Sequence, residues 1–209
     1  QDQLFETMEK FGFGSTPAID LPNQGAESEV APSGIYGEGH LLHRDDPVDL
    51  ARVAIGQERL LATPLQMALV AAAIANGGKL MKPQIWNRVI DPDGRVVDQL
   101  DPSVYSEPVS AATAAELTTA MEGVVSEGTG ANAAIPGVPV AGKTGTAETP
   151  FNDTCGGGAE ENQAWFIGFA PADDPQIAIA ATVECTTAFG NDVAAPIFRD
   201  VAETILAGE

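Results

Sequence analysis

The sequence predicts a mixed α/β (α+β) domain, and three of its features lead to that expectation. Three segments, at about 139–148, 163–170 and 176–185, are extended, and the last two are apolar enough to be central strands. Three others carry apolar residues at helical spacing and begin near residues 64, 111 and 194. The chain has 209 residues, of which 44% are hydrophobic, so it can bury one core and is too apolar to be disordered.

Acidic residues outnumber basic ones by thirty to ten, which gives a formal net charge of -20. A surface this negative repels nucleic acids and anionic lipids, so we expect no nucleic-acid partner. An anionic ligand would need a specific local cation, and the chain has only four lysines to supply one.

The sequence contains no run of eighteen apolar residues, so none of it is expected to span a membrane. Its first residues, QDQLFETMEK, lack the basic and apolar regions of a signal peptide. We expect any export signal or membrane anchor to lie outside this chain.

The N-terminal part predicts one helix followed by an irregular segment. Residues 4–11 place four apolar side chains on one helical face, and two glycines then end the pattern. From 15 to 48 the chain is rich in Pro, Gly, Ser and Asp, which predicts an irregular surface segment. His40 and His43 lie there without a cysteine or acidic partner at ligand spacing, so we expect surface or structural roles and no metal site.

The stretch ATPLQMALVAAAIANGG predicts a buried helix with a defined start. Thr63 can cap this helix, Pro64 suits its first position, and the side chain of Gln66 can reach back to complete a capping box. Asn76 and the two glycines after it end the helix. The small apolar residues within it predict close packing on several sides.

A hairpin and two further helices complete the pattern. Ile85 to Val97 reads as a short hairpin with a turn at Asp91 to Gly94. Residues 111–126 and 194–206 read as amphipathic helices. Their inward faces are expected to carry Ala114, Leu117, Met121, Val124 and Val125 in the first helix, and Ile197, Phe198, Val201 and Ile205 in the second.

Residues 135–148, IPGVPVAGKTGTAE, match two motifs at once. Gly137 to Thr144 fits the G-x-x-x-x-G-K-T pattern of a phosphate-binding loop, and Lys143 to Thr146 reads K-T-G-T. A phosphate loop needs a strand before it and a helix that begins at its Lys-Thr. Neither flank fits, because GTGANAAIP is no buried strand and the glycines and proline after the motif oppose a helix. The context therefore predicts an edge strand.

An edge strand offers unpaired N–H and C=O groups to an extended peptide. Lys143 can neutralise a ligand carboxylate, to which the hydroxyls of Thr144 and Thr146 can donate hydrogen bonds. Gly145 leaves room for the ligand backbone, and a strand N–H can stabilise a developing oxyanion. These four residues form the predicted substrate-binding site, with Lys143 and Thr146 as its catalytic members; no metal and no cofactor is expected.

Four longer stretches surround or contain this motif: EKFGFGSTPAIDLP, AIGQERLLATPLQMALVAAAIANGGKLMKP, SEGTGANAAIPGVPVAGKTGTAE and AWFIGFAPADDPQIAIAATVE. In this order and spacing they resemble the C-terminal part of the transpeptidase domain of penicillin-binding proteins, especially the monofunctional class B enzymes of actinobacteria. The resemblance covers nearly all 209 residues. It implies a β-lactamase/transpeptidase-like fold, with an antiparallel sheet flanked by helices on both faces.

The resemblance also implies roles for the K-T-G-T residues. Lys143, Thr144 and Thr146 would recognise the carboxylate of the substrate or of a β-lactam, and the Thr146 N–H would form half of an oxyanion hole. The family's other motifs, Ser-x-x-Lys and Ser-x-Asn, are absent, because no serine here has Lys three residues on or Asn two residues on. Residues 1–209 are therefore expected to be the C-terminal part of a single domain, without the nucleophile and inactive alone.

The family sheet continues beyond the strand predicted at 176–185. The sheet of this chain is therefore expected to be incomplete at its N-terminal side, and that strand would be an open, aggregation-prone edge. The missing N-terminal part of the same domain is an expected partner, either as a separate piece or as residues outside this sequence.

The two cysteines allow two alternatives. If the three strands run up, down and up, Cys155 and Cys185 fall at the same end of the sheet. Because the family works outside the cytoplasm, a disulfide between them is one alternative, and it would contribute roughly 3–4 kcal/mol by closing a loop of about thirty residues. Two reduced thiols are the other.

The resemblance implies a peptidoglycan D,D-transpeptidase that cross-links D-Ala-D-Ala stem peptides through an acyl-serine intermediate and is trapped by β-lactams. The parent protein is expected to be extracytoplasmic and anchored in the cell membrane by a segment outside this chain. A serine β-lactamase or a non-catalytic β-lactam sensor is the alternative within the fold, although the GQ…TPLQ segment favours a transpeptidase. A phosphate-loop nucleotide-binding module and a structural or interaction domain are the alternatives from other classes.

Overall fold

The computed structural model describes residues 1–17, 19, 31–148 and 162–208. The elements in chain order are α1 (Asp2–Lys10), β1 (Gly34–Gly37), β2 (His40–Leu41), α2 (Leu50–Ala54), β3 (Leu60–Leu61), α3 (Pro64–Ala75), β4 (Leu80–Met81), β5 (Arg88–Ile90), β6 (Val96–Gln99), β7 (Val104–Ser106), α4 (Ala111–Ser126), the 3-10 helix η1 (Ala131–Ala133), β8 (Ala141–Glu148), β9 (Asn162–Ala170), β10 (Ile177–Thr186) and α5 (Gly190–Leu206).

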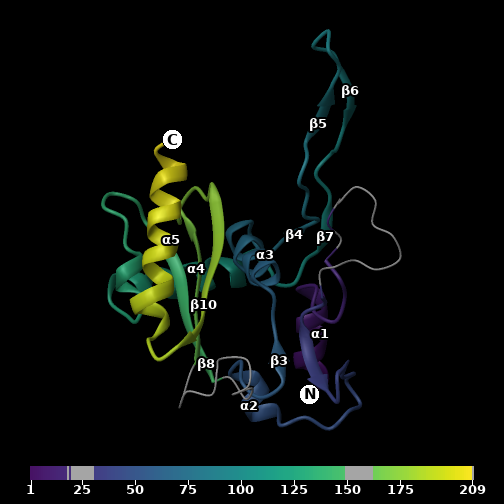
Figure 1. Cartoon of the computed structure of the whole chain (residues 1–209), viewed down its shortest axis with the longest axis vertical. Coiled ribbons are helices and arrows are strands. Elements are labelled where there is room, and N and C mark those ends of the chain that lie inside the picture. Colours follow the sequence, from purple (N-terminus) through teal and green to yellow (C-terminus); the bar gives the residue numbers. More distant parts are fainter. Residues whose placement is uncertain (18, 20–30, 149–161, 209) are drawn as a thin grey trace.

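The described elements fall into two parts on either side of α3 (Figure 1). The first part holds α1, α2 and a small sheet of order β2-β1-β3. The second holds a larger sheet of order β10-β9-β8 with α4 and α5. The hairpin of β5 and β6 projects away from both parts (Figure 1).

The first part contains more strand than the sequence predicts. α1 confirms the helix expected at 4–11, but the expectation of an irregular segment over 15–48 is wrong where β1 pairs with β2 and β3. The cause is tertiary, because Ile35 of β1 is only 2% exposed and packs with Phe5 and Val53. Strands of two to four residues are too short for an alternating pattern to reveal.

The start of α3 is capped from two directions. As predicted, Thr63 Oγ1 accepts a hydrogen bond from the Gln66 N–H (3.1 Å). The predicted return bond from the Gln66 side chain is wrong, because that side chain is buried and donates to the carbonyl O of Phe11 (2.7 Å). Ser33 Oγ instead accepts from the Thr63 N–H (2.9 Å). The start of α3 is thus held by two segments that are distant in the sequence, one at Phe11 and one at Ser33.

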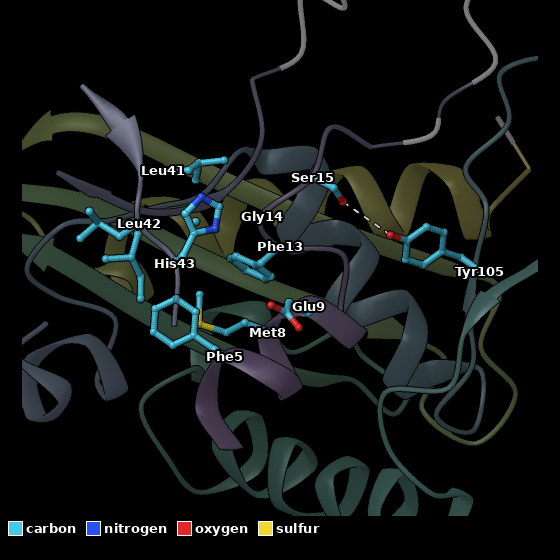
Figure 2. A pocket seen from close by; sticks show the side chains of 12 residues that line it. Phe5, Met8, Glu9, Phe13, Gly14, Ser15, Leu41, Leu42, His43 and Tyr105 are labelled. Carbon is cyan, nitrogen blue, oxygen red and sulfur yellow. Dashed lines mark hydrogen bonds between the residues drawn. The ribbon is translucent and has the colours of Figure 1, made fainter. Parts of the chain in front are cut away.

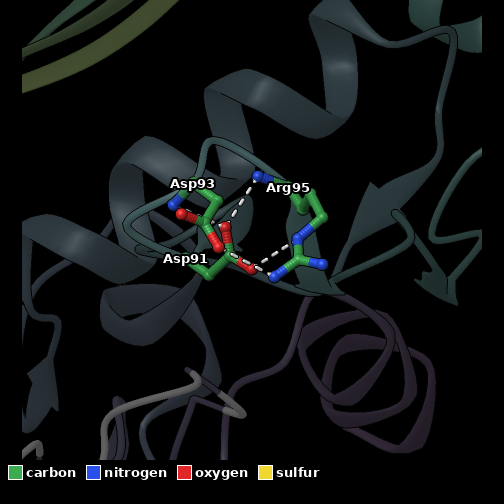
Figure 3. A network of polar contacts seen from close by, with 3 residues as sticks. All are labelled: Asp91, Asp93 and Arg95. Carbon is green, nitrogen blue, oxygen red and sulfur yellow. Dashed lines mark hydrogen bonds and ion pairs between the residues drawn. The ribbon is translucent and has the colours of Figure 1, made fainter.

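The predicted hairpin turn at Asp91 to Gly94 is confirmed, and a polar network closes it (Figure 3). Asp91 Oδ1 accepts hydrogen bonds from the N–H groups of Asp93 (3.0 Å) and Arg95 (2.9 Å). The Arg95 guanidinium forms ion pairs with both carboxylates, at 2.9 Å to Asp91 and 3.0 Å to Asp93. The apolar side chains of the hairpin are exposed and form no core. The conformation of its tip is therefore held by this polar network.

The larger sheet confirms the antiparallel sheet with helices on both faces. β9 is its central strand and pairs antiparallel with β8 and β10, whose bounds lie within two residues of the predicted segments. Ile74 of α3 packs against Phe169 on one face, and Phe198 of α5 packs against Phe166 on the other. Within the described ranges, β8 and β10 each pair only with β9, so both are edge strands.

The C-terminal helix differs from its prediction in start and in orientation. It begins at Gly190, four residues before the expected start, and its buried side chains include Ala194, Ala195, Phe198 and Ala202. The expected inward positions Ile197, Val201 and Ile205 are wrong, since each is more than 40% exposed. Small side chains let the helix approach the sheet closely, which outweighs the greater hydrophobicity of the Ile-Val stripe.

None of the described helices is both long and apolar enough to cross a membrane. No free cysteine thiol occurs in the part of the chain that the structure describes. Cys155 lies outside the described residues, so the predicted choice between a Cys155–Cys185 disulfide and two thiols is not decided for that residue.

The core between the sheet and α5 leads to a stability prediction. Phe166 is fully buried, with its ring centroid 4.9 Å from that of Phe198. Phe166→Ala should lower the free energy of unfolding by about 3–5 kcal/mol, because it leaves a cavity that the packed sheet cannot fill. Urea unfolding measures the change. The control Phe189→Ala removes a ring that is 64% exposed and should stay within about 0.5 kcal/mol of the wild type; equal losses would contradict the packing described.

Candidate functional site

The K-T-G-T residues lie in the middle of an edge strand. β8 runs from Ala141 to Glu148, so Lys143 is a strand residue and does not open a helix. The residues before it form a turn at Gly137 (φ 79°) that is closed by a bridge between Ile135 and Val138. This geometry confirms the predicted strand and excludes a phosphate loop, whose Lys-Thr begins a helix.

Two hydrogen bonds identify the backbone groups of β8 that face away from β9. The side chain of Gln57 donates to the carbonyl O of Thr146 (3.3 Å) and accepts from the N–H of Glu148 (3.2 Å). In an antiparallel strand both backbone groups of one residue point to the same side, and successive residues alternate. The Thr146 N–H therefore points to the free edge, which is the position the predicted oxyanion contact requires.

Lys143 lies opposite Ile167 of β9, on the sheet face that packs against α3. Its exposed side chain returns to the strand edge, where Nζ donates a 2.7 Å hydrogen bond to the carbonyl O of Thr144. Among the residues that the structure describes, no carboxylate forms an ion pair with this ammonium group. Its charge is therefore available to an anionic ligand.

The hydroxyl of Thr144 contacts a residue that the sequence patterns do not indicate. Thr144 lies opposite Phe166, and its Oγ1 is 3.0 Å from Oγ1 of Thr129 in the loop after α4. One hydrogen joins the two hydroxyls, so the other hydroxyl hydrogen can be donated to a ligand. The donation of Thr144 and Thr146 hydroxyls to a carboxylate stays a prediction.

A cleft of about 350 Å³ opens beside β8. The connection from α2 to α3 and the first turns of α3 form one wall, and the sheet forms the other. Apolar side chains from both walls line it, among them Ile55, Leu61, Met67, Trp165 and Ile167, and the charged Lys143 comes from the sheet. An extended ligand on the edge of β8 would therefore contact side chains as well as the strand backbone.

The two ends of this cleft differ in polarity. Lys143 lies at β8, whereas Thr182 and Glu184 of β10 also contribute to the lining. The Thr182 hydroxyl O is buried and has no hydrogen-bond partner within the described ranges. Glu184 would repel an anion, which leaves the Lys143 end for a ligand carboxylate.

The N-terminus of α5 packs closely against the backbone of the site. A Cβ at Gly190 would overlap the carbonyl O of Trp165 and lie 2.8 Å from the carbonyl O of Gly145. Only glycine fits this contact, because the neighbouring atoms belong to paired strands and cannot move aside. The position of α5 and the position of the K-T-G-T strand are therefore linked.

A second cavity of about 280 Å³ lies in the N-terminal part, between α1 and β1 (Figure 2). Its lining is mostly apolar, with Glu9 and His43 as polar members, and none of its lining residues belongs to β8. In the described part of the chain, no group of three or more His, Cys, Asp or Glu side chains could hold a metal ion. The cleft beside β8 is accordingly the better candidate for the predicted chemistry.

The structure thus brings Lys143, Thr144, Gly145 and Thr146 together on one strand edge, and it adds Gln57. Sequence reasoning missed Gln57 because its contact with β8 spans 89 residues, and no local pattern reveals such a pair. The local signals were Gly56 before it, which is typical of a helix end, and the GQ…TPLQ segment, which favours a transpeptidase but gives the Gln57 side chain no role.

Comparison with known proteins identifies relatives of the whole chain. The family model described as the penicillin binding protein transpeptidase domain matches residues 1–203. Stage V sporulation protein D of Bacillus subtilis is 37% identical over 206 residues, which cover 96% of this chain and 30% of that protein. Peptidoglycan D,D-transpeptidase PbpA of Mycobacterium tuberculosis is 37% identical over 214 residues, which cover 100% of this chain and 40% of that protein.

Solved structures agree in fold. The crystal structure of PBPA from M. tuberculosis matches with a TM-score of 0.79 and 34% identity, over 99% of this chain and 46% of that one. The penicillin G acyl-enzyme complex of the same protein matches with a TM-score of 0.78 and 33% identity, over 99% and 43%. The chain therefore spans less than half the length of these relatives.

The contact between α5 and the site generates a second stability prediction. Gly190→Ala should lower the free energy of unfolding by about 1–3 kcal/mol, because the added methyl must displace backbone atoms of β8 and β9. Gly123→Ala is the matched control in the interior of α4, where a Cβ would meet nothing within 4 Å. It should instead stabilise by about 0.5–1 kcal/mol. Thermal unfolding of both variants checks the signs; a neutral Gly190→Ala would rule out the close contact.

Proposed function

The chain belongs to the family of penicillin-binding protein transpeptidase domains, and from that premise we propose that it provides the ligand-binding edge strand of a peptidoglycan D,D-transpeptidase. One observation carries the proposal: an ammonium group that forms no ion pair with any described carboxylate and an outward-facing backbone N–H lie three residues apart on an exposed strand edge beside a cleft. Such an edge suits an extended peptide that ends in a carboxylate.

In the proposed reaction, the ligand peptide lies along β8 with its terminal carboxylate at Lys143. A serine hydroxyl attacks the carbonyl carbon of the D-Ala-D-Ala bond, and the developing oxyanion accepts a hydrogen bond from the Thr146 N–H. The peptide bond then breaks, the terminal D-Ala leaves with the proton of the serine hydroxyl on its amine, and an acyl-serine ester remains. An amine of a second stem peptide attacks this ester, which forms a new amide bond, and its proton returns to the serine oxygen. A β-lactam has a carboxylate and a reactive carbonyl in a similar arrangement, so it would acylate the same serine.

The nucleophile is proposed to come from the part of the domain that precedes these residues, since no serine of this chain carries the family's motifs. Residues 1–209 would then be the C-terminal part of one domain and inactive alone. Two surfaces support a contact with that part: the free edge of β10 and the exposed stripe of Ile197, Val201 and Ile205 on α5. Both would be unfavourable to leave in water.

The acyl-enzyme complexes known for M. tuberculosis PBPA with imipenem and penicillin G support β-lactams as ligands of the proposed site. Because stem peptides are cross-linked outside the cytoplasmic membrane, we propose an extracytoplasmic location for the parent protein, with its membrane anchor in a segment outside this chain. No nucleic acid is proposed as a partner, given the formal net charge of -20.

Labelling with a fluorescent penicillin tests the proposal in the complete domain. Lys143→Ala should slow acylation about 10- to 100-fold, because it removes a charge-assisted hydrogen bond to the carboxylate that is worth about 1.5–3 kcal/mol. Mass spectrometry of the intact protein measures the acylated fraction over time. Lys79→Ala removes the same charge at an exposed turn after α3 and should label at the wild-type rate.

Three outcomes would count against the proposal. Equal labelling of the Lys143→Ala and wild-type proteins would remove Lys143 from the site. Rapid hydrolysis of the acyl-enzyme, seen as multiple turnovers of a chromogenic cephalosporin, would favour a β-lactamase. Stable acylation without any transfer to an amine acceptor would favour a β-lactam sensor.

A further inference from the structure

The side chain of Gln57 replaces a neighbouring strand at the end of β8. Its amide donates to the carbonyl O of Thr146 (3.3 Å) and accepts from the N–H of Glu148 (3.2 Å), so it occupies one acceptor and one donor of the free edge. In a parallel ladder, the N–H and C=O of one residue of an added strand would make the same pair of bonds. Gln57 therefore holds the carbonyl group of Thr146, the residue whose own N–H faces the cleft.

Gln57 is itself positioned by a helix end. The N–H of Gly56 bonds to the carbonyl O of Val53 (3.0 Å), and the N–H of Gln57 bonds to that of Arg52 (3.0 Å). With Gly56 at φ 80°, these two bonds form the Schellman motif that ends α2. The direction in which Gln57 leaves the helix is thus set by backbone geometry.

The backbone around Gln57 is also strained. Glu58, directly after it, has φ 70°, which is an uncommon conformation for a residue with a side chain. Such strain persists where the surrounding structure holds it in place, and it is often found near functional sites. Here two left-handed residues, Gly56 and Glu58, flank the side chain that hydrogen-bonds to the strand backbone.

A second contact ties the same helix to the same strand end. Arg52 of α2 forms an ion pair of 3.8 Å with Glu148 of β8, although both side chains are largely exposed. On its other side, α2 is anchored by Val53, which is 2% exposed and packs with Phe5 and Ile35. Figure 1 shows α2 beside the end of β8. The end of the strand is therefore held from the N-terminal core.

We propose that Gln57 is a positioning residue, which holds the end of β8 so that the Thr146 N–H is aimed at the reacting carbonyl of a bound ligand. The inference rests on the proposed function, because it concerns the same N–H. Gln57 does not touch the reacting atoms and acts through the strand. A hydrogen-bond donor misplaced by a fraction of an ångström loses much of its effect on an oxyanion, so the rate of acylation and not ligand affinity depends on Gln57.

The test compares Gln57→Met with the wild type in the complete domain, since Met keeps the length of the side chain and removes both hydrogen bonds. Acylation by penicillin G is followed by stopped-flow fluorescence, which separates the acylation rate constant from the dissociation constant of the initial complex. The rate constant should fall about tenfold or more, with the dissociation constant and the melting temperature unchanged. Gln57→Glu keeps an acceptor for the Glu148 N–H and should recover part of the rate.

Two controls separate positioning from other effects. Gln3→Met makes the same exchange at an exposed position of α1 and should leave the rate unchanged. Hydrogen exchange of backbone amides, measured by NMR, should rise at least tenfold at Glu148 in Gln57→Met, because that N–H loses its acceptor.

Each possible result of these experiments either supports or overturns the positioning role of Gln57. Faster exchange at Glu148 with an unchanged acylation rate constant would make Gln57 a structural residue only and overturn the proposal. Unchanged exchange would show that the contact is not formed in solution, which also overturns it. A weaker initial complex with a normal rate constant would assign Gln57 to ligand binding instead. If the wild-type domain is not acylated at all, the proposed function fails, whereas the exchange result still reports on the contact.

Discussion

The register of β8 against β9 is the constraint on which the rest of the site depends. With Lys143 opposite Ile167, the backbone groups of Thr144 and Thr146 face the free edge while the Lys143 side chain lies on the face toward α3. A slip of one residue would exchange these sets, turning the Thr146 N–H toward β9 and Lys143 toward α5. The arrangement of charge and donor on this edge therefore follows from a single pairing.

The core holds that register through shape. A Cβ at Gly142 would overlap the ring of Phe166, and that ring packs on Phe198 of α5. Gly190 at the start of α5 then lies against the backbone of Gly145. A bulky ring on the central strand, a glycine under that ring on the neighbouring strand and a helix with a small-residue face thus form one packing unit. The strand edge is exposed, but its position is fixed from the buried side.

Local sequence patterns predicted much of this structure. They failed where contacts between residues distant in the sequence determine the conformation. The three strands and the edge position of Lys143 followed from apolar runs, glycines and prolines that lie within a few residues of each other. The second cap of α3 from Ser33 and the contact of Gln57 with Thr146 join segments that no local pattern relates. The buried face of α5 was predicted wrongly because the hydrophobic pattern favours Ile197 over Ala194 for burial. Close packing of the helix on the sheet instead selects the smaller side chain.

We propose that a ligand binds along the edge of β8, with its carboxylate at Lys143 and its reacting carbonyl at Thr146. A crystal structure of the complete domain acylated by penicillin G would test this binding mode. The carbonyl oxygen of the acyl group should lie within about 3 Å of the Thr146 nitrogen, and the carboxylate should lie within hydrogen-bond distance of Lys143 or Thr144. An acyl group whose carbonyl oxygen points away from β8, or whose carboxylate lies near Glu184, would contradict it.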